Sequence, residues 1–169
     1  ERKYPDEIEA IRKGVRTAEE VHSASRELLE PGLREIDYYA QLVARATSEA
    51  ETPFVMMCDL ASGERAAGGG GAPGKRVIGE GDLVILDIFP YVEGYRGDIT
   101  NTLVAGGNPT SDQADLFALV TSSLEKAEAL LRPGTPAAAF SEAIIETFSA
   151  AGEELVHHAG HAIGLGHPE

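Results

Sequence analysis

The stretch LVILDIFPYVEGYRGDIT at residues 83–100 constrains the fold more than any other part of the chain. Its first seven residues are apolar on both faces of an extended chain, apart from one aspartate, and EGYRG supplies turn residues before a second strand. The stretch therefore predicts a β-hairpin over 83–104 whose first strand is buried. Each strand of the hairpin contains one aspartate, Asp87 in the first and Asp98 in the second.

The position of the turn decides how the two aspartates face each other. A turn centred on 93–94 brings Phe89 opposite Asp98 and leaves Asp87 one diagonal away on the same face. A turn centred one residue earlier sets the two aspartates directly opposite each other, whereas a three-residue loop separates them. Either of the first two registers holds the carboxylates about 5–8 Å apart on one face of the hairpin.

Two neighbouring carboxylates in an apolar setting repel each other and lose hydration. A shared proton, a basic partner or a metal ion compensates for this cost. Arg96 is the nearby basic residue of a purely structural ion-pair cluster, but such a cluster poorly explains Asp87 inside an apolar strand. Divalent cations prefer oxygen ligands, so the two aspartates are a candidate metal site.

The remainder of the chain is predicted to form an α+β fold in two similar halves. Apolar periodicity and Pro-Gly breaks predict helices over 5–29, 34–50, 112–131 and 137–151, and an extended segment over 54–61. The motif LLEPG at 28–32 recurs as LLRPG at 130–134, each time between two predicted helices. This repetition predicts a duplication, with a first half at 1–106 and an incomplete second half at 107–169 that lacks a hairpin.

Composition excludes several classes of function. The net charge of −14 argues against nucleic acid and anionic membranes as partners, and no apolar run reaches the about 18 residues of a membrane span. The single cysteine, Cys58, lies in an apolar run and is expected to be a buried side chain rather than a reactive thiol. A chain without an internal disulfide is typical of the cytoplasm.

A glycine-rich stretch, GGGAPGKR at residues 69–76, has the spacing of a phosphate-binding loop. Such a loop needs a helix directly after its lysine, whereas the residues that follow here are strand-like. We therefore expect a flexible lip over the metal site, where glycines leave room for a substrate.

The histidines are concentrated at one end of the chain. Four of the five lie in the last thirteen residues: His157, His158, His161 and His167. The spacing of His157 and His161 is that of a helical zinc pair, but the neighbouring glycines oppose a helix. We expect a loop that presents one imidazole to a metal and another to a substrate, with a solvated tail as the alternative.

Together, LDIFPYVEGYRGDITNT and HHAGHAIGLGHPE resemble the pita-bread metallopeptidase family, which includes methionine aminopeptidase, Xaa-Pro aminopeptidase, prolidase and creatinase. The resemblance covers essentially the whole chain and is greatest to the Xaa-Pro peptidases. It implies a pita-bread fold with two pseudo-symmetric α+β halves, the second of them incomplete in this chain.

The resemblance also implies a set of metal ligands. In this family two Asp, one His and two Glu hold two divalent ions, and Asp87, Asp98 and His161 correspond to the first three. The two Glu ligands would lie beyond Glu169, and the chain starts without Met and stops inside a loop, so we expect it to be part of a longer protein. Oxygen-rich ligation favours manganese, with cobalt or zinc as alternatives.

By the same resemblance, His157 and His167 are the candidates for contacting the peptide or the tetrahedral intermediate. Two positions depart from the family pattern: Gly70 stands where a substrate-contacting His is expected, and Pro168 where a second helper His is expected. These departures concern the residues that orient substrate and handle protons, rather than the metal ligands.

The resemblance therefore implies a homodimeric hydrolase that cleaves a short Xaa-Pro peptide with a hydroxide bridging two metal ions, and the single cysteine implies that it is cytoplasmic. One alternative is a peptidase-like binding module that has lost its activity. Another is a creatinase-like enzyme that acts on an amidine or an amide on the same scaffold.

Overall fold

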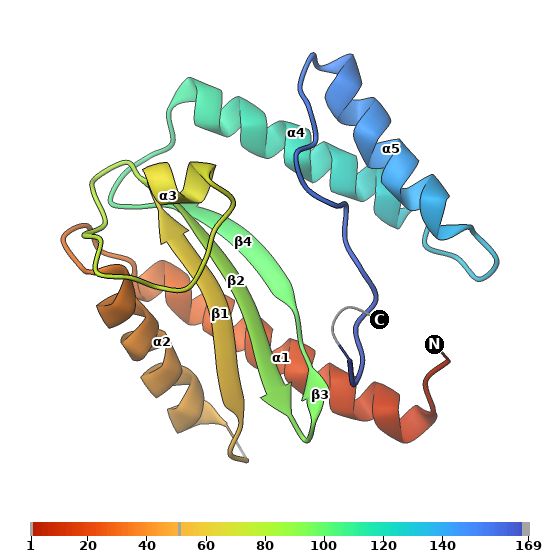
Figure 1. Cartoon of the computed structure of the whole chain (residues 1–169), viewed down its shortest axis with the longest axis horizontal. Helices are drawn as coiled ribbons and strands as arrows, with labels where there is room; N and C mark the ends of the chain where they lie inside the picture. The colour runs from red at the N-terminus through yellow and green to blue at the C-terminus, as the bar shows by residue number, and fades with distance from the viewer. Residues whose placement is uncertain (1, 51, 167–169) are drawn as a thin grey trace. The chain divides into compact units, whose positions relative to one another are not determined.

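The computed structural model describes residues 2–50 and 52–166, which divide into two compact units (Figure 1). The first unit contains the described residues up to Asn108 together with the segment from Ile163 onward, and the second contains Pro109–Ala162. The proposed aspartate ligands belong to the first unit, whereas His157 and His161 belong to the second.

The first unit is built from three helices and one antiparallel sheet. Its elements are α1 (Pro5–Leu28), α2 (Glu35–Glu49), β1 (Val55–Ser62), α3 (Glu64–Ala67), β2 (Leu83–Val92), β3 (Tyr95–Arg96) and β4 (Ile99–Val104). Strand β2 pairs with β1, with the short β3 and with β4. The predicted helices and the hairpin are thus confirmed, whereas the sequence did not reveal the short α3.

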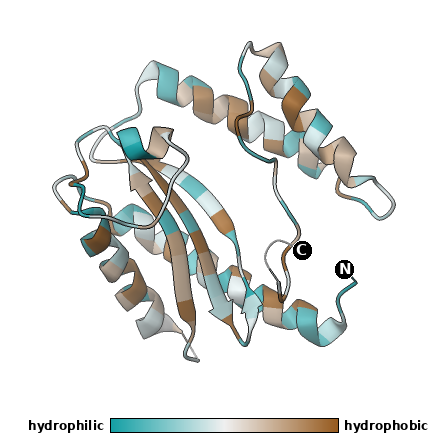
Figure 2. Cartoon of the chain, viewed as in Figure 1, coloured by the Kyte–Doolittle hydropathy of each residue, from teal (hydrophilic) through white to brown (hydrophobic). Residues whose placement is uncertain are grey.

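Burial alternates along β2 because its side chains point alternately to the two faces of the sheet. Val84, Leu86 and Ile88 are fully buried on one face, where they pack with apolar side chains of α1 and α2, among them Val21 and Leu42. Figure 1 shows both helices on this face of the sheet, and Figure 2 shows apolar residues along β1 and β2.

The other face of the sheet carries the odd-numbered residues of β2, which are half-buried, and we call it the open face. Asp87 lies on it. The prediction that this strand is buried on both faces is therefore wrong. Apolar residues such as Ile85 and Phe89 give the open face the composition of a core, but packing within the first unit covers this face only in part.

The hairpin turns at Glu93 and Gly94, whose φ angles of 52° and 86° fit the left-handed conformation of a two-residue hairpin turn. The register follows from this turn, since Val92 pairs with Tyr95 and Asp87 pairs with Thr100. The turn centred on 93–94 is thus confirmed among the alternatives that the sequence left open.

Helix α1 meets the hairpin backbone at Gly97, the residue directly before Asp98. A Cβ atom on Gly14 of α1 would lie 2.6 Å from the Gly97 nitrogen, closer than real Cβ atoms approach other heavy atoms. Beside this contact, the Lys13 ammonium lies 2.7 Å from a Glu93 carboxylate oxygen. The glycine pair therefore permits a backbone contact that sets the position of the second aspartate relative to α1.

The second unit is a helical hairpin of α4 (Ser111–Glu128) and α5 (Ala137–Ala150). Thr110 begins α4, and its hydroxyl accepts a hydrogen bond from the Gln113 nitrogen at 3.3 Å. Helix α5 begins 102 residues after α2, the offset that separates LLEPG from LLRPG. Residues 151–162, which follow α5, form no strand. Among the described residues, no helix is long and apolar enough to span a bilayer.

Candidate metal centre

The hairpin register places Asp87 and Asp98 on the open face. Asp87 pairs with Thr100 across the β2–β4 ladder, and the Thr100 hydroxyl donates a hydrogen bond of 2.8 Å to the Asp87 Oδ1 atom. Asp98 lies two residues before Thr100, so the pleat points both side chains to the same face. Both aspartates are half-buried, and the threonine fixes the orientation of the Asp87 carboxylate.

A third carboxylate lies beside Asp87. Asp59 of β1 pairs directly with Asp87 and shares the half-buried open face. Sequence reasoning missed it because no local signal gives the register between β1 and β2, which are separated by twenty residues. Cys58 is buried, as expected, and burial, followed by the charges of Asp59 and Asp87, raises the pKa of its thiol to about 12.

Arg96 does not neutralise the two hairpin aspartates. Its guanidinium carbon lies 4.5 Å from the centre of the Tyr91 ring and 5.1 Å from that of Phe89, and the residue is only 6% exposed. Among the described residues, Arg96 makes no ion pair with Asp87 or Asp98. The structural ion-pair cluster that the sequence left open is therefore not formed by this arginine.

The histidines form a loop cluster in the second unit. The rings of His157 and His158 lie 3.9 Å apart and those of His158 and His161 lie 5.6 Å apart, and all three side chains are exposed. His167 and Pro168 lie outside the described residues. Within the part of the chain that the structure describes, no three His, Cys, Asp or Glu side chains are grouped closely enough to hold a metal ion.

The glycine-rich stretch lies against β1. Gly69, Gly70 and Gly71 have φ angles of 95°, 102° and 120°, and the Gly71 carbonyl accepts a hydrogen bond of 2.9 Å from the Leu60 nitrogen. A Cβ atom on Gly70 would lie 3.8 Å from the Asp59 Cβ atom. No helix follows the lysine of this stretch, as expected, so it lacks the helix N-terminus of a phosphate-binding loop.

Comparison with known proteins identifies the family. The sequence profile of metallopeptidase family M24 matches residues 9–169. The chain belongs to this family. A probable dipeptidase PepE of Mycobacterium tuberculosis is 33% identical over 168 residues, which cover 96% of this chain and 44% of that protein. The Xaa-Pro aminopeptidase of Escherichia coli is 28% identical over 133 residues, covering 79% of this chain and 30% of the enzyme.

Solved structures of M24 relatives confirm the pita-bread fold. A prolidase from Pyrococcus furiosus matches with a TM-score of 0.91 and 28% identity, over 99% of this chain and 50% of the prolidase chain. An Xaa-Pro dipeptidase from Bacillus anthracis matches with a TM-score of 0.89 and 26% identity. The chain spans about half the length of these M24 relatives.

His22, the fifth histidine, lies beneath the hairpin and was missed by the sequence reasoning, which considered only the tail. It is 6% exposed on α1, and its Nε2 atom lies 2.8 Å from the Ile99 carbonyl oxygen. A carbonyl only accepts hydrogen bonds, so Nε2 carries the proton. Because Ile99 directly follows Asp98, this hydrogen bond holds the start of β4 against α1.

Burial lowers the pKa of His22 below its usual 6.5, and it outweighs the Ile99 carbonyl, which raises the pKa. The folded protein therefore holds this imidazole neutral, whereas the unfolded chain binds the proton near pH 6.5. The stability contribution of neutral His22 is present above that pH and is lost as the pH falls through the folded pKa.

We expect the free energy of unfolding to decrease below pH 6.5, with one proton contributing a slope of at most about 1.4 kcal/mol per pH unit. His22→Gln retains a donor for the Ile99 carbonyl but does not titrate, so its slope should be smaller. Urea denaturation between about pH 5 and pH 8 measures both slopes. If the free energy of unfolding changed equally with pH in wild type and His22→Gln, the pKa of His22 would not be lowered by folding.

Proposed function

We propose that this chain provides part of the active site of an Xaa-Pro peptidase, in which Asp87, Asp98 and His161 hold two divalent metal ions. The observation that carries the proposal is the shared open face of the two hairpin aspartates in a chain of a metallopeptidase family. The names of the relatives support the substrate class, since they are dipeptidases, prolidases and Xaa-Pro aminopeptidases.

The donors on the open face fit a divalent ion. Both are carboxylates of one hairpin on the open face, and the Thr100 hydroxyl donates its hydrogen bond to Oδ1 of Asp87 rather than to Oδ2. Bound divalent ions lower the pKa of a metal-bound water and polarise the scissile carbonyl. Oxygen donors favour manganese over cobalt or zinc.

The protein's own groups orient the substrate in this proposal. His157 and His167 bind the peptide or stabilise the oxygen of the tetrahedral intermediate by donating hydrogen bonds. The apolar side chains of the open face, Met57 and Phe89 among them, provide a surface for an apolar residue of a short peptide. We further propose that the protein is cytoplasmic, which its lone buried cysteine supports, and that it forms a homodimer, which the family resemblance implies.

The test is hydrolysis of Ala-Pro by the manganese-loaded protein, measured as released proline, with creatine as the competing substrate. Proline release that stops on adding a chelator and returns with manganese would support the peptidase. Faster hydrolysis of creatine would replace it with the creatinase-like enzyme. Saturable binding of Ala-Pro without hydrolysis would replace it with the inactive binding module.

A further inference from the structure

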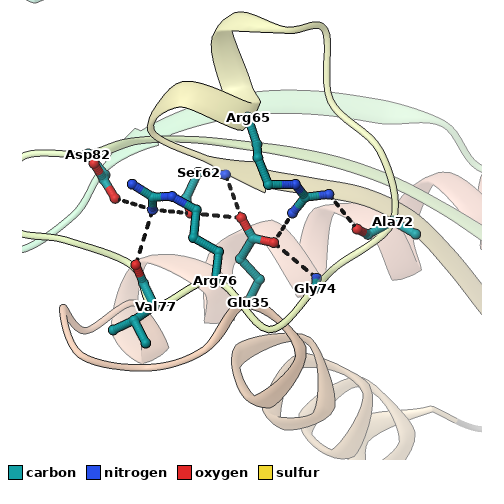
Figure 3. Close-up of polar contacts among 8 residues, drawn as sticks. All are labelled: Glu35, Ser62, Arg65, Ala72, Gly74, Arg76, Val77 and Asp82. Atoms are coloured by element: carbon teal, nitrogen blue, oxygen red, sulfur yellow. Dashed lines mark hydrogen bonds and ion pairs between the residues drawn. The ribbon is translucent and has the colours of Figure 1, made fainter.

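A buried carboxylate joins four segments at the end of β1. Glu35, at the start of α2, is fully buried. Its Oε1 atom accepts hydrogen bonds from the Ser62 nitrogen at 2.9 Å and from the Ser62 hydroxyl at 2.8 Å, and its Oε2 atom accepts one from the Gly74 nitrogen at 3.0 Å. Arg65 of α3 completes the shell with an ion pair to Oε2 (Figure 3).

These partners flank the glycine segment, residues 68–71, on both sides. Ser62 and Arg65 precede it, and Gly74 follows it. Arg65 also donates a hydrogen bond of 2.8 Å to the Ala72 carbonyl, and the Gly74 carbonyl accepts one of 2.9 Å from the Ile36 nitrogen. The entrance and the exit of the glycine segment are therefore fixed to the same end of α2 (Figure 3).

The glycine segment depends on these fixed ends. Three consecutive glycines at positive φ have many accessible conformations, so their own preferences do not select one of them. In the structure the segment lies on β1 beside Asp59, whose strand partner is Asp87. Glu35 itself lies on α2, and among the described residues its polar partners are Ser62, Arg65 and Gly74 rather than either hairpin aspartate.

We propose that Glu35 is a positioning residue that holds the glycine segment at the rim of the metal site. Its charge orients Arg65 and the Gly74 amide, and these set where the segment lies over β1. The segment in turn limits the space above Asp59 and Asp87 that a substrate enters. This inference rests on the proposed function only for its kinetic consequence, because the position of the segment is measurable without activity.

The experiment compares Glu35→Gln with Asp82→Asn by hydrogen exchange and by Ala-Pro kinetics. Asp82 pairs with Arg76, which also donates to the Ser62 hydroxyl at 2.7 Å, so Asp82→Asn makes the same charge change in the neighbouring ion pair. Arg65→Lys is the second variant if Glu35→Gln folds poorly, since it keeps the positive charge but shortens the reach to Ala72. The readouts are amide exchange at 68–72, KM, kcat and manganese content.

We expect exchange at 68–72 to accelerate at least about tenfold in Glu35→Gln and in Arg65→Lys, but less than about twofold in Asp82→Asn. In Glu35→Gln and Arg65→Lys, KM for Ala-Pro should rise about tenfold, whereas kcat should stay within about threefold of wild type and the manganese content should not change. Equal exchange at 68–72 in Glu35→Gln and Asp82→Asn would overturn the proposal. So would a loss of kcat with an unchanged KM. If wild type hydrolyses no Ala-Pro, the proposed function fails and exchange alone decides the role of Glu35.

Discussion

Asp87→Asn should lower the affinity of the protein for manganese by at least about 100-fold. The substitution keeps the size of the side chain and its hydrogen bond from Thr100, but it removes the negative charge of a proposed ligand. Elemental analysis after manganese loading and desalting should therefore find the ion in wild type and not in the variant.

Asp59→Asn is the matched control for this result. Asp59 pairs directly with Asp87 on the same open face and loses the same charge, but it is not among the proposed ligands. Its affinity for manganese should stay within about threefold of wild type, because screening by water weakens a charge effect that lacks direct coordination. Equal losses in the two variants would mean that the acidic face attracts cations without a defined site.

Gly14→Ala should destabilise the first unit by about 2–3 kcal/mol, although the same change stabilises most helices. Alanine is favoured over glycine inside a helix by up to about 1 kcal/mol. Here the added methyl group would lie 2.6 Å from the Gly97 nitrogen and 3.2 Å from its Cα atom, and these are backbone atoms that cannot rotate away. This clash is relieved only if α1 and the hairpin move apart, and that movement opens the core beneath Ile99.

The sign of the effect is the diagnostic result. Ser23→Ala, at an exposed position of the same helix, should change the free energy of unfolding by less than about 0.5 kcal/mol, so urea denaturation of the three proteins separates packing from helix propensity. A stabilised Gly14→Ala protein would show that α1 does not contact Gly97. Because Gly97 precedes Asp98, we also expect the destabilised variant to bind manganese more weakly.

The local elements were predictable because each leaves a local signal. The hairpin follows from apolar strands around Glu93 and Gly94, and the helices follow from apolar periodicity that ends at Pro-Gly breaks. The register of the two aspartates follows from the turn, since each residue of a hairpin is tied to its partner by the length of the loop. These relations lie within one short segment of sequence.

The contacts between distant segments were not predictable in the same way. Asp59 is brought to Asp87 by the pairing of β1 with β2, and Glu35 is brought to Ser62 and Gly74 by the packing of α2 on the sheet. Gly14 did leave a signal, because a glycine inside a long helix lowers the stability of the helix and so suggests a position where another segment approaches closely. Only the fold identifies Gly97 as that neighbour. The half-burial of Asp87 likewise depends on how packing covers the open face.

The most direct test of the metal centre is to locate the ion by NMR. Paramagnetic Mn²⁺ added in small amounts broadens the amide signals of the residues nearest to it. A site held by the two hairpin aspartates predicts that the signals of Asp87, Asp98 and Thr100 disappear first, while those of the exposed acidic surface persist. Broadening that begins elsewhere, or spreads evenly over a chain with a net charge of −14, would contradict a metal site at the hairpin.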